Sequence, residues 1–179
     1  MRIEIFEDMA LCTAEEVQRL LPLVSHLRRE QAMKYKHVFG QYCCLKSWLM
    51  LKNIIGEVEE WSYNEHGKPF LKNGPFFSIS HCKEGIAVAV DQQPIGIDIE
   101  AIRHADAELI ERVMNREEQL RVKNDRDFTR LWTQKEAILK CDGTGIESFE
   151  QLQSIDPTAY HIQTVETEKY IYSIAYKNT

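Results

Sequence analysis

The sequence predicts an α+β fold in which helical and strand regions alternate twice along 179 residues. Residues 13–55 carry apolar side chains at the three- and four-residue spacing of helices. After Gly67-Lys68-Pro69 the chain changes to short apolar runs separated by turns, which are typical of strands. Helical composition and then strand composition return once more, so we expect two similar α+β halves.

The N-terminal half is expected to begin with a strand and to continue with helices. Residues 1–8 alternate apolar and polar side chains, as strands do. Thr13 followed by Glu16 is the pattern of a helix N-terminal cap, and it precedes an apolar stripe with the helical period. Pro22 interrupts this stripe. A second helix is expected over about residues 40–55, where apolar residues recur at helical spacing and Gly56 follows the end.

The later elements follow from apolar runs and capping residues. Three apolar runs predict a short antiparallel meander, with strands at residues 76–80, 86–90 and 95–100. Helices are expected at about 106–122 and 127–140, and further strands at 160–164 and 170–176. Asn115 with Glu118 offers a helix cap, and Gly143 offers a helix stop.

Composition limits the ligands and the cellular location that we expect. A formal charge of −6 opposes broad attraction to nucleic acid or to an anionic membrane surface. The apolar runs stop short of the roughly 20 residues that a membrane helix needs, and the N-terminus lacks the pattern of a signal peptide. Five cysteines without C-x-x-C spacing indicate neither disulfides nor a zinc cluster, and we expect a cytoplasmic protein with reduced thiols.

Two acidic residues, Asp98 and Glu100, lie at the end of an apolar strand. The two-residue period of a strand places both carboxylates on one face, roughly 6 to 7 Å apart along the chain. Oxygen ligands of this kind suit Mg²⁺, which takes one or two protein carboxylates and completes its shell with water and phosphate oxygens. The alternative is a pair of solvated acids at a strand end.

A second group of polar residues follows one face of the later helix. Trp132, Glu136 and Lys140 are spaced four apart and therefore form one stripe, with Lys135 on its flank. The alternative interpretation is an exposed Glu136–Lys140 pair beside a core tryptophan, a common arrangement that contributes only about 0.3–0.5 kcal/mol.

Three further polar residues could contact a phosphate group. Ser80 and His81 follow an apolar strand, and Lys68 lies between Gly67 and Pro69. His81 could donate a hydrogen bond to a phosphate oxygen or could be satisfied by the backbone. Lys68 could bind phosphate or could be an exposed turn residue.

Together these segments form an ordered set: G-K-P at 67–69, S-H at 80–81, G-x-D-x-E at 96–100 and W-x-x-K-E-A at 132–137, followed by Lys140 and G-T-G at 143–145. This set resembles the 4′-phosphopantetheinyl transferase superfamily, in particular the type that activates surfactin synthetase. The resemblance runs from about residue 25 to residue 150. The pairing of G-x-D-x-E with W-x-x-K-E-A is its most specific part.

The resemblance implies a fold of two similar α+β halves related by a pseudo-twofold, with coenzyme A in the cleft between them. The halves would comprise residues 1–90 and 91–179. It implies an enzyme that transfers the phosphopantetheine arm of coenzyme A to a serine of an apo acyl or peptidyl carrier protein and releases adenosine 3′,5′-bisphosphate. The implied metal is Mg²⁺, or else Mn²⁺. A monomer is expected, because the two halves would complete one site.

The resemblance also implies roles for individual residues. Asp98, Glu100 and Glu136 would hold the metal, and Glu136 would also accept the serine proton. Lys135 and Lys140 would contact the pyrophosphate and the attacking region, which makes Lys140 a catalytic candidate together with Glu136. The expected contacts to the adenosine and phosphate groups of coenzyme A are Arg28, Lys68, Ser80 and His81.

The sequence departs from the family pattern at two cationic positions. Gln31 stands where a lysine is often found, and Cys43 stands where an arginine usually contacts the 3′-phosphate. Lys34 or Lys46 could substitute for them. These departures favour one alternative, a non-catalytic module that binds coenzyme A or a carrier protein. Another alternative, a general Mg²⁺ phosphohydrolase, leaves the tryptophan–lysine–glutamate stripe unexplained.

Overall fold

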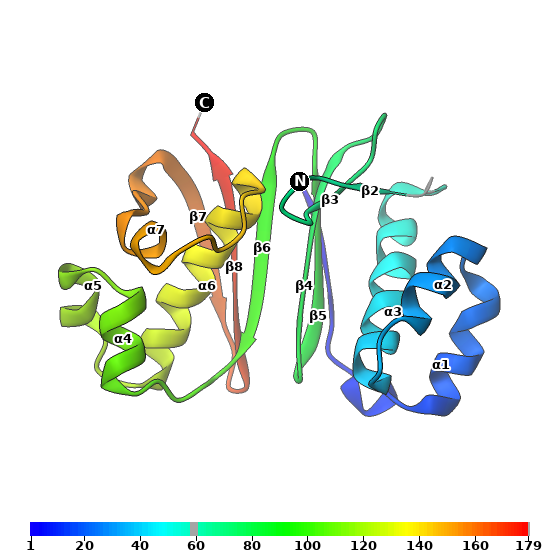
Figure 1. Ribbon diagram of the computed structural model, residues 1–179, viewed down its shortest axis with the longest axis horizontal. Helices are drawn as coiled ribbons and strands as arrows, with labels where there is room; N and C mark the ends of the chain where they lie inside the picture. Colours follow the sequence, from blue (N-terminus) through cyan, green and yellow to red (C-terminus); the bar gives the residue numbers. More distant parts are fainter. Residues whose placement is uncertain (58–60, 179) are drawn as a thin grey trace.

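A computed structural model describes residues 1–57 and 61–178 of the chain. Two three-stranded antiparallel sheets lie in the middle, with strand orders β1-β5-β4 and β6-β8-β7, and the longer helices lie outside them (Figure 1). The described helices are α1 (Ala14–Leu20), α2 (His26–Met33), α3 (Val38–Ile55), α4 (Ala107–Val113), α5 (Arg116–Arg121), α6 (Asp125–Asp142) and α7 (Phe149–Ser154). The described strands are β1 (Arg2–Phe6), β2 (Ser62–Tyr63), β3 (Pro69–Phe70), β4 (Phe76–Cys82), β5 (Gly85–Asp91), β6 (Ile95–Ala101), β7 (Tyr160–Glu166) and β8 (Tyr170–Lys177). The predicted α+β class is confirmed.

The helices of the N-terminal half begin and end where local chemistry requires it. The Thr13 hydroxyl accepts a hydrogen bond from the Glu16 amide at 3.2 Å, which starts α1 as the sequence predicts. Pro22 lies in a short 3₁₀ turn that follows α1, so the helical stripe is broken there. The predicted second helix is α3, although α2 precedes it as a separate element.

The predicted three-strand meander is wrong in its third strand. Strand β5 pairs with β4 on one side and with β1 on the other, so both of its edges are occupied. Strand β6 therefore pairs antiparallel with β8, close to the C-terminus of the chain. It is an edge strand of the second sheet. Local sequence located all three strands, but the partner of β6 lies far along the chain.

The helical region predicted at about 106–122 is divided into α4 and α5, whereas the other predicted helix is α6 and the two predicted strands are β7 and β8. The Asn115 side chain and Glu118 form a complete capping box at the start of α5. Helix α6 ends at Gly143, whose left-handed backbone, with a φ of 78°, suits a residue without a side chain. The short helix α7 and the β2–β3 hairpin were not expected from the sequence.

The two sheets have the same internal order, since in each the last strand along the chain lies between the other two. Each sheet is accompanied by one helix of 18 residues, α3 or α6. The turn between β5 and β6 lies at the predicted boundary near residue 91. The pseudo-twofold relation and the division into halves stay predictions. None of the helices that the structure describes has both the length and the apolar character that a membrane span requires.

The β2–β3 hairpin connects the N-terminal half to the end of α6. The Asn64 carboxamide oxygen accepts hydrogen bonds from the His66 and Lys68 amides, at 3.0 and 2.8 Å, and so shapes the turn before Pro69. The amide group of Asn64 donates to the Gly143 carbonyl oxygen at 2.7 Å. The G-K-P and G-T-G segments therefore meet in space.

Helix α6 and strand β6 are in backbone contact at Gly96. A Cβ atom at this position would overlap the Ala137 carbonyl oxygen and the Cys141 amide nitrogen, both of which belong to α6. Only glycine permits so close an approach of a helix to a strand. Because Asp98 and Glu100 lie on β6 while Glu136 and Lys140 lie on α6, this contact fixes the separation of the four candidate residues.

We expect Gly96→Ala to destabilise the fold by about 3 kcal/mol, because the added methyl group meets helix backbone that cannot rotate away. For a chain of this size the melting temperature should fall by about 6–12 °C. Gly74→Ala is the comparison variant, because its Cβ would also be crowded, at 2.8 and 2.9 Å, but by the Leu71 side chain and not by helix backbone. Thermal unfolding of the two variants measures the difference, and a parental melting temperature for Gly96→Ala would contradict the contact.

Candidate active site

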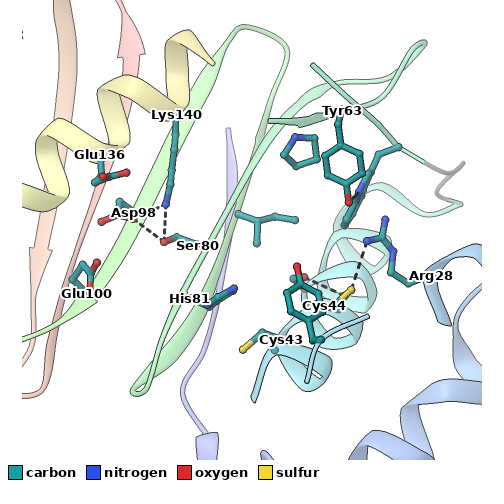
Figure 2. Close-up of a pocket in the computed structure, with 16 residues that line it drawn as sticks. Arg28, Cys43, Cys44, Tyr63, Ser80, His81, Asp98, Glu100, Glu136 and Lys140 are labelled. Atoms are coloured by element: carbon teal, nitrogen blue, oxygen red, sulfur yellow. Dashed lines mark hydrogen bonds and ion pairs between the residues drawn. The ribbon is translucent and has the colours of Figure 1, made fainter. Parts of the chain in front are cut away.

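A pocket of about 420 Å³ opens between α2 and α3 on one side and β4, β6 and α6 on the other. Figure 2 shows the acidic residues on the side of β6 and α6, and Arg28 with two cysteines on the opposite side. The polar and aromatic residues that line the pocket include Arg28, Tyr35, Cys43, Cys44, Trp61, Tyr63, Ser80, His81, Asp98, Glu100, Glu136 and Lys140. The structure thus gathers most of the sequence-predicted residues in one place.

Asp98 is the most buried acid of the pocket, with 3% of its surface exposed. Its Oδ1 atom accepts a hydrogen bond from the Ser80 hydroxyl at 2.8 Å and forms an ion pair with Lys140 Nζ at 2.5 Å. Its Oδ2 atom is buried and has no hydrogen-bond partner. A buried carboxylate oxygen without a partner is costly, so Oδ2 is a position at which a ligand would be stabilised.

Glu100 and Glu136 line the same pocket, and the pKa of each is raised. Burial, with the neighbouring charge of Asp98, raises the pKa of Glu100 above its ordinary value. Burial is also the first cause at Glu136, and Asp98 adds to it, so that the pKa of Glu136 rises to about 7. The acids therefore destabilise one another's charged forms. A cation bound between them would relieve this repulsion.

The donor chemistry of the pocket fits a hard divalent cation. Asp98, Glu100 and Glu136 offer only carboxylate oxygens, and Asp98 Oδ2 lacks a protein partner. Within residues 1–57 and 61–178, no three His, Cys, Asp or Glu side chains lie close enough together to hold a metal ion in their present positions. A cation that used all three carboxylates would therefore require side-chain adjustment.

Lys140 is the cation that contacts Asp98 directly. One helical turn after Glu136, its Nζ contacts Asp98 Oδ1 and also donates to the Ser80 hydroxyl at 2.9 Å. Because Ser80 lies on β4, this interaction joins the N-terminal half to β6 and α6 (Figure 2). The exposed Glu136–Lys140 surface pair considered from the sequence is not what the structure shows.

Arg28 supplies positive charge on the opposite side of the pocket. Its guanidinium carbon lies 3.7 Å from the centre of the Trp61 ring, and Nη1 lies 3.8 Å from the Cys44 sulfur. The Trp61 indole N–H donates to the Tyr63 hydroxyl at 2.8 Å. Trp61 and Tyr63 were missed by sequence reasoning, and their only signal was two aromatic residues shortly before the G-K-P turn.

Two predicted ligands lie outside this pocket. Lys68 lines two adjoining pockets, and its Nζ donates to the carbonyl oxygens of Ile95 and Cys141 at 3.4 and 3.3 Å. Burial lowers its pKa. Lys135 is 2% exposed, and its Nζ contacts Glu118 Oε1 at 2.7 Å. This buried ion pair joins α6 to α5, and the substrate contact that the resemblance implied for Lys135 stays a prediction.

The departures from the family pattern leave the Arg28 side with little further charge. Cys43 lines the pocket, and burial raises the pKa of its thiol to about 12, so the side chain is neutral. Lys46 lies over the Phe6 ring at 3.9 Å, and Lys34 donates to the Gln31 side chain at 3.2 Å. Neither lysine lines the pocket.

Comparison with known proteins agrees with the pattern of the site. Residues 94–178 match the model of the 4′-phosphopantetheinyl transferase superfamily. The chain is 33% identical to 4′-phosphopantetheinyl transferase gsp of Aneurinibacillus migulanus, over 63% of this chain and 50% of that protein. It is 29% identical to 4′-phosphopantetheinyl transferase Sfp of Bacillus subtilis (strain 168), over 79% of this chain and 70% of Sfp.

A third relative is 4′-phosphopantetheinyl transferase AcpT of Salmonella typhi, which is 30% identical over 68% of this chain and 71% of its own length. The matched region of the gsp protein spans only about half of that relative. In each of these comparisons the similarity extends beyond single motifs, and the family match contains Asp98, Glu100, Glu136 and Lys140. By these matches, the chain belongs to the 4′-phosphopantetheinyl transferase superfamily.

Proposed function

We propose that this protein transfers the 4′-phosphopantetheine arm of coenzyme A to a serine of an apo acyl or peptidyl carrier protein, in a reaction that depends on Mg²⁺. The observation that carries the proposal is the convergence of Asp98, Glu100, Glu136 and Lys140 in one pocket that faces Arg28. The names of the relatives given above support the same reaction class. The acidic cluster alone would also suit a phosphohydrolase.

The reaction joins the serine oxygen to the β-phosphorus of coenzyme A and breaks the bond from that phosphorus to the bridging oxygen. The leaving group is adenosine 3′,5′-bisphosphate. The serine proton passes to the Glu136 carboxylate, which lines the pocket and is half-buried. Lys140, one helical turn away, supplies positive charge where the phosphate oxygens gain negative charge.

Asp98, Glu100 and Glu136 would hold Mg²⁺. When bound, the ion would neutralise charge on the phosphate oxygens and help to orient them. Asp98 Oδ2, which has no hydrogen-bond partner in the protein, would be one of the atoms that bind the ion. On the opposite side Arg28 would bind a phosphate group of the donor, because Trp61 stacks on its guanidinium and holds it in place.

One observation favours a second candidate, a non-catalytic module that binds coenzyme A or a carrier protein. The neutral Cys43 in the pocket wall offers a phosphate no charge. A binding module would retain the fold and would not transfer the arm.

Transfer itself separates the two candidates. After incubation of several apo carrier proteins with this protein, coenzyme A and Mg²⁺, we expect the intact mass of at least one carrier to rise by one phosphopantetheine group. Chelation of the metal should abolish the gain. Unmodified carriers throughout, together with measurable binding of coenzyme A, would instead establish the binding module.

Glu136→Gln keeps the size of the side chain but removes the charge that both proton transfer and cation binding require. Loss of a general base alone typically costs 10²–10⁴-fold, so the transfer rate should fall by at least about a hundredfold. The melting temperature should stay near the parental value. Glu117→Gln, an exposed acid of α5, is the control and should transfer normally. Parental transfer by Glu136→Gln would remove Glu136 from the mechanism.

The neutral Cys43 and Gln31 predict weak selection for the 3′-phosphate of coenzyme A. A charge-assisted hydrogen bond to phosphate contributes about 1.5–3 kcal/mol, which is roughly 10- to 150-fold in kcat/KM. We expect kcat/KM for coenzyme A and for its 3′-dephospho form to differ by less than about tenfold. A preference above about a hundredfold would mean that another cation contacts the 3′-phosphate.

A further inference from the structure

The contacts of Ser80 are not those expected of a residue whose only role is to bind coenzyme A. It lies on β4, in the N-terminal half, and only 7% of its surface is exposed. Its hydroxyl donates to Asp98 Oδ1 at 2.8 Å and accepts from Lys140 Nζ at 2.9 Å. Both the proton and an acceptor site of this hydroxyl are thus used within the protein, and its partners are two candidate catalytic residues.

The two oxygens of Asp98 have different surroundings as a result. Oδ1 receives Ser80 and Lys140, whereas Oδ2 is buried without a hydrogen-bond partner. A carboxylate fixed through one oxygen cannot rotate freely, so the other oxygen keeps one direction. Second-shell hydrogen bonds of this kind orient metal ligands, and their loss typically costs 10–100-fold in metal affinity.

We propose that Ser80 is a positioning residue which, together with Lys140, fixes Oδ1 of Asp98 and so presents Oδ2 as the ligand atom for the divalent cation. The inference rests on the proposed function, because it assumes that Asp98 binds the metal. It replaces the role that the resemblance implied for Ser80, a contact to coenzyme A. The bridge also links the two halves, so the geometry of the metal ligand on β6 depends on β4.

A matched control lies two residues earlier on the same face of the same strand. Ser78 is also buried, and its hydroxyl accepts a hydrogen bond from the Ile97 amide at 3.0 Å. Ser78→Ala and Ser80→Ala each remove one buried hydroxyl that joins β4 to β6. Only Ser80→Ala removes a hydrogen bond to the carboxylate of Asp98, so a general loss of packing affects both variants alike.

The test measures Mn²⁺ binding directly. Free Mn²⁺ is counted by electron paramagnetic resonance in titrations of the protein saturated with coenzyme A, and a blank without protein corrects for binding to coenzyme A. We expect Ser80→Ala to raise the Kd for Mn²⁺ by at least about tenfold. Ser78→Ala should stay within about threefold of the parent. At saturating Mn²⁺, the KM of Ser80→Ala for coenzyme A should change by less than about threefold.

A parental Kd for Mn²⁺ in Ser80→Ala would overturn the positioning role. If the KM for coenzyme A were then raised tenfold or more, Ser80 would instead contact coenzyme A. A parent protein that binds no Mn²⁺ would contradict the proposed metal site and this inference with it, so the two failures are distinguishable.

Thermal unfolding checks that the variants are folded at the assay temperature. If Ser80→Ala is not folded there, the isosteric pair Ser80→Thr and Ser80→Val repeats the comparison, since only threonine retains the hydroxyl. The positioning role requires tighter Mn²⁺ binding by Ser80→Thr than by Ser80→Val. Equal affinities would overturn it.

Discussion

The close contact between α6 and β6 at Gly96 is the constraint on which the site depends. Without a side chain at this position, the helix backbone rests directly on the strand. Two residues later on the strand comes Asp98, and on the helix Glu136 and Lys140 flank the same contact. The glycine of the G-x-D-x-E motif therefore belongs to the site through packing, because it sets how near the acids and the lysine can be.

The second dependence is between the segments that precede and follow the turn between β5 and β6. Strand β4 lies beside β6, and its serines reach across, Ser78 to the main chain and Ser80 to Asp98. Both interactions are buried, where hydrogen bonds are strong and an unmade one is expensive. The acidic side of the pocket is thus completed by the part of the chain that also provides Arg28. A fragment with β6 and α6 alone would keep Lys140 but would lack Ser80, the other group that contacts Asp98 Oδ1.

The sequence predicted those parts of the site that follow from local periodicity. Asp98 with Glu100, and Glu136 with Lys140, share faces because strands repeat every two residues and helices nearly every four. Lys135 lies on the flank of the stripe on α6, since one residue turns a helix by about 100°, but its contact with Glu118 on α5 had no local signal. Two contacts join segments far apart in the chain: Arg28 stacks on Trp61, and β6 pairs with β8. Local sequence patterns do not predict such long-range contacts.

Charge balance connects the site to the ligands proposed for it. Lys140 and Arg103 offset the three carboxylates only in part, so the pocket by itself repels a phosphate and disfavours its own ionised acids. A divalent cation would reverse both effects at once. Cation and phosphate donor should therefore favour each other's binding, since each reduces the electrostatic cost of the other. Such coupling would let a chain with a net charge of −6 bind the proposed polyanionic donor, because much of the positive charge near the donor would be that of the metal ion.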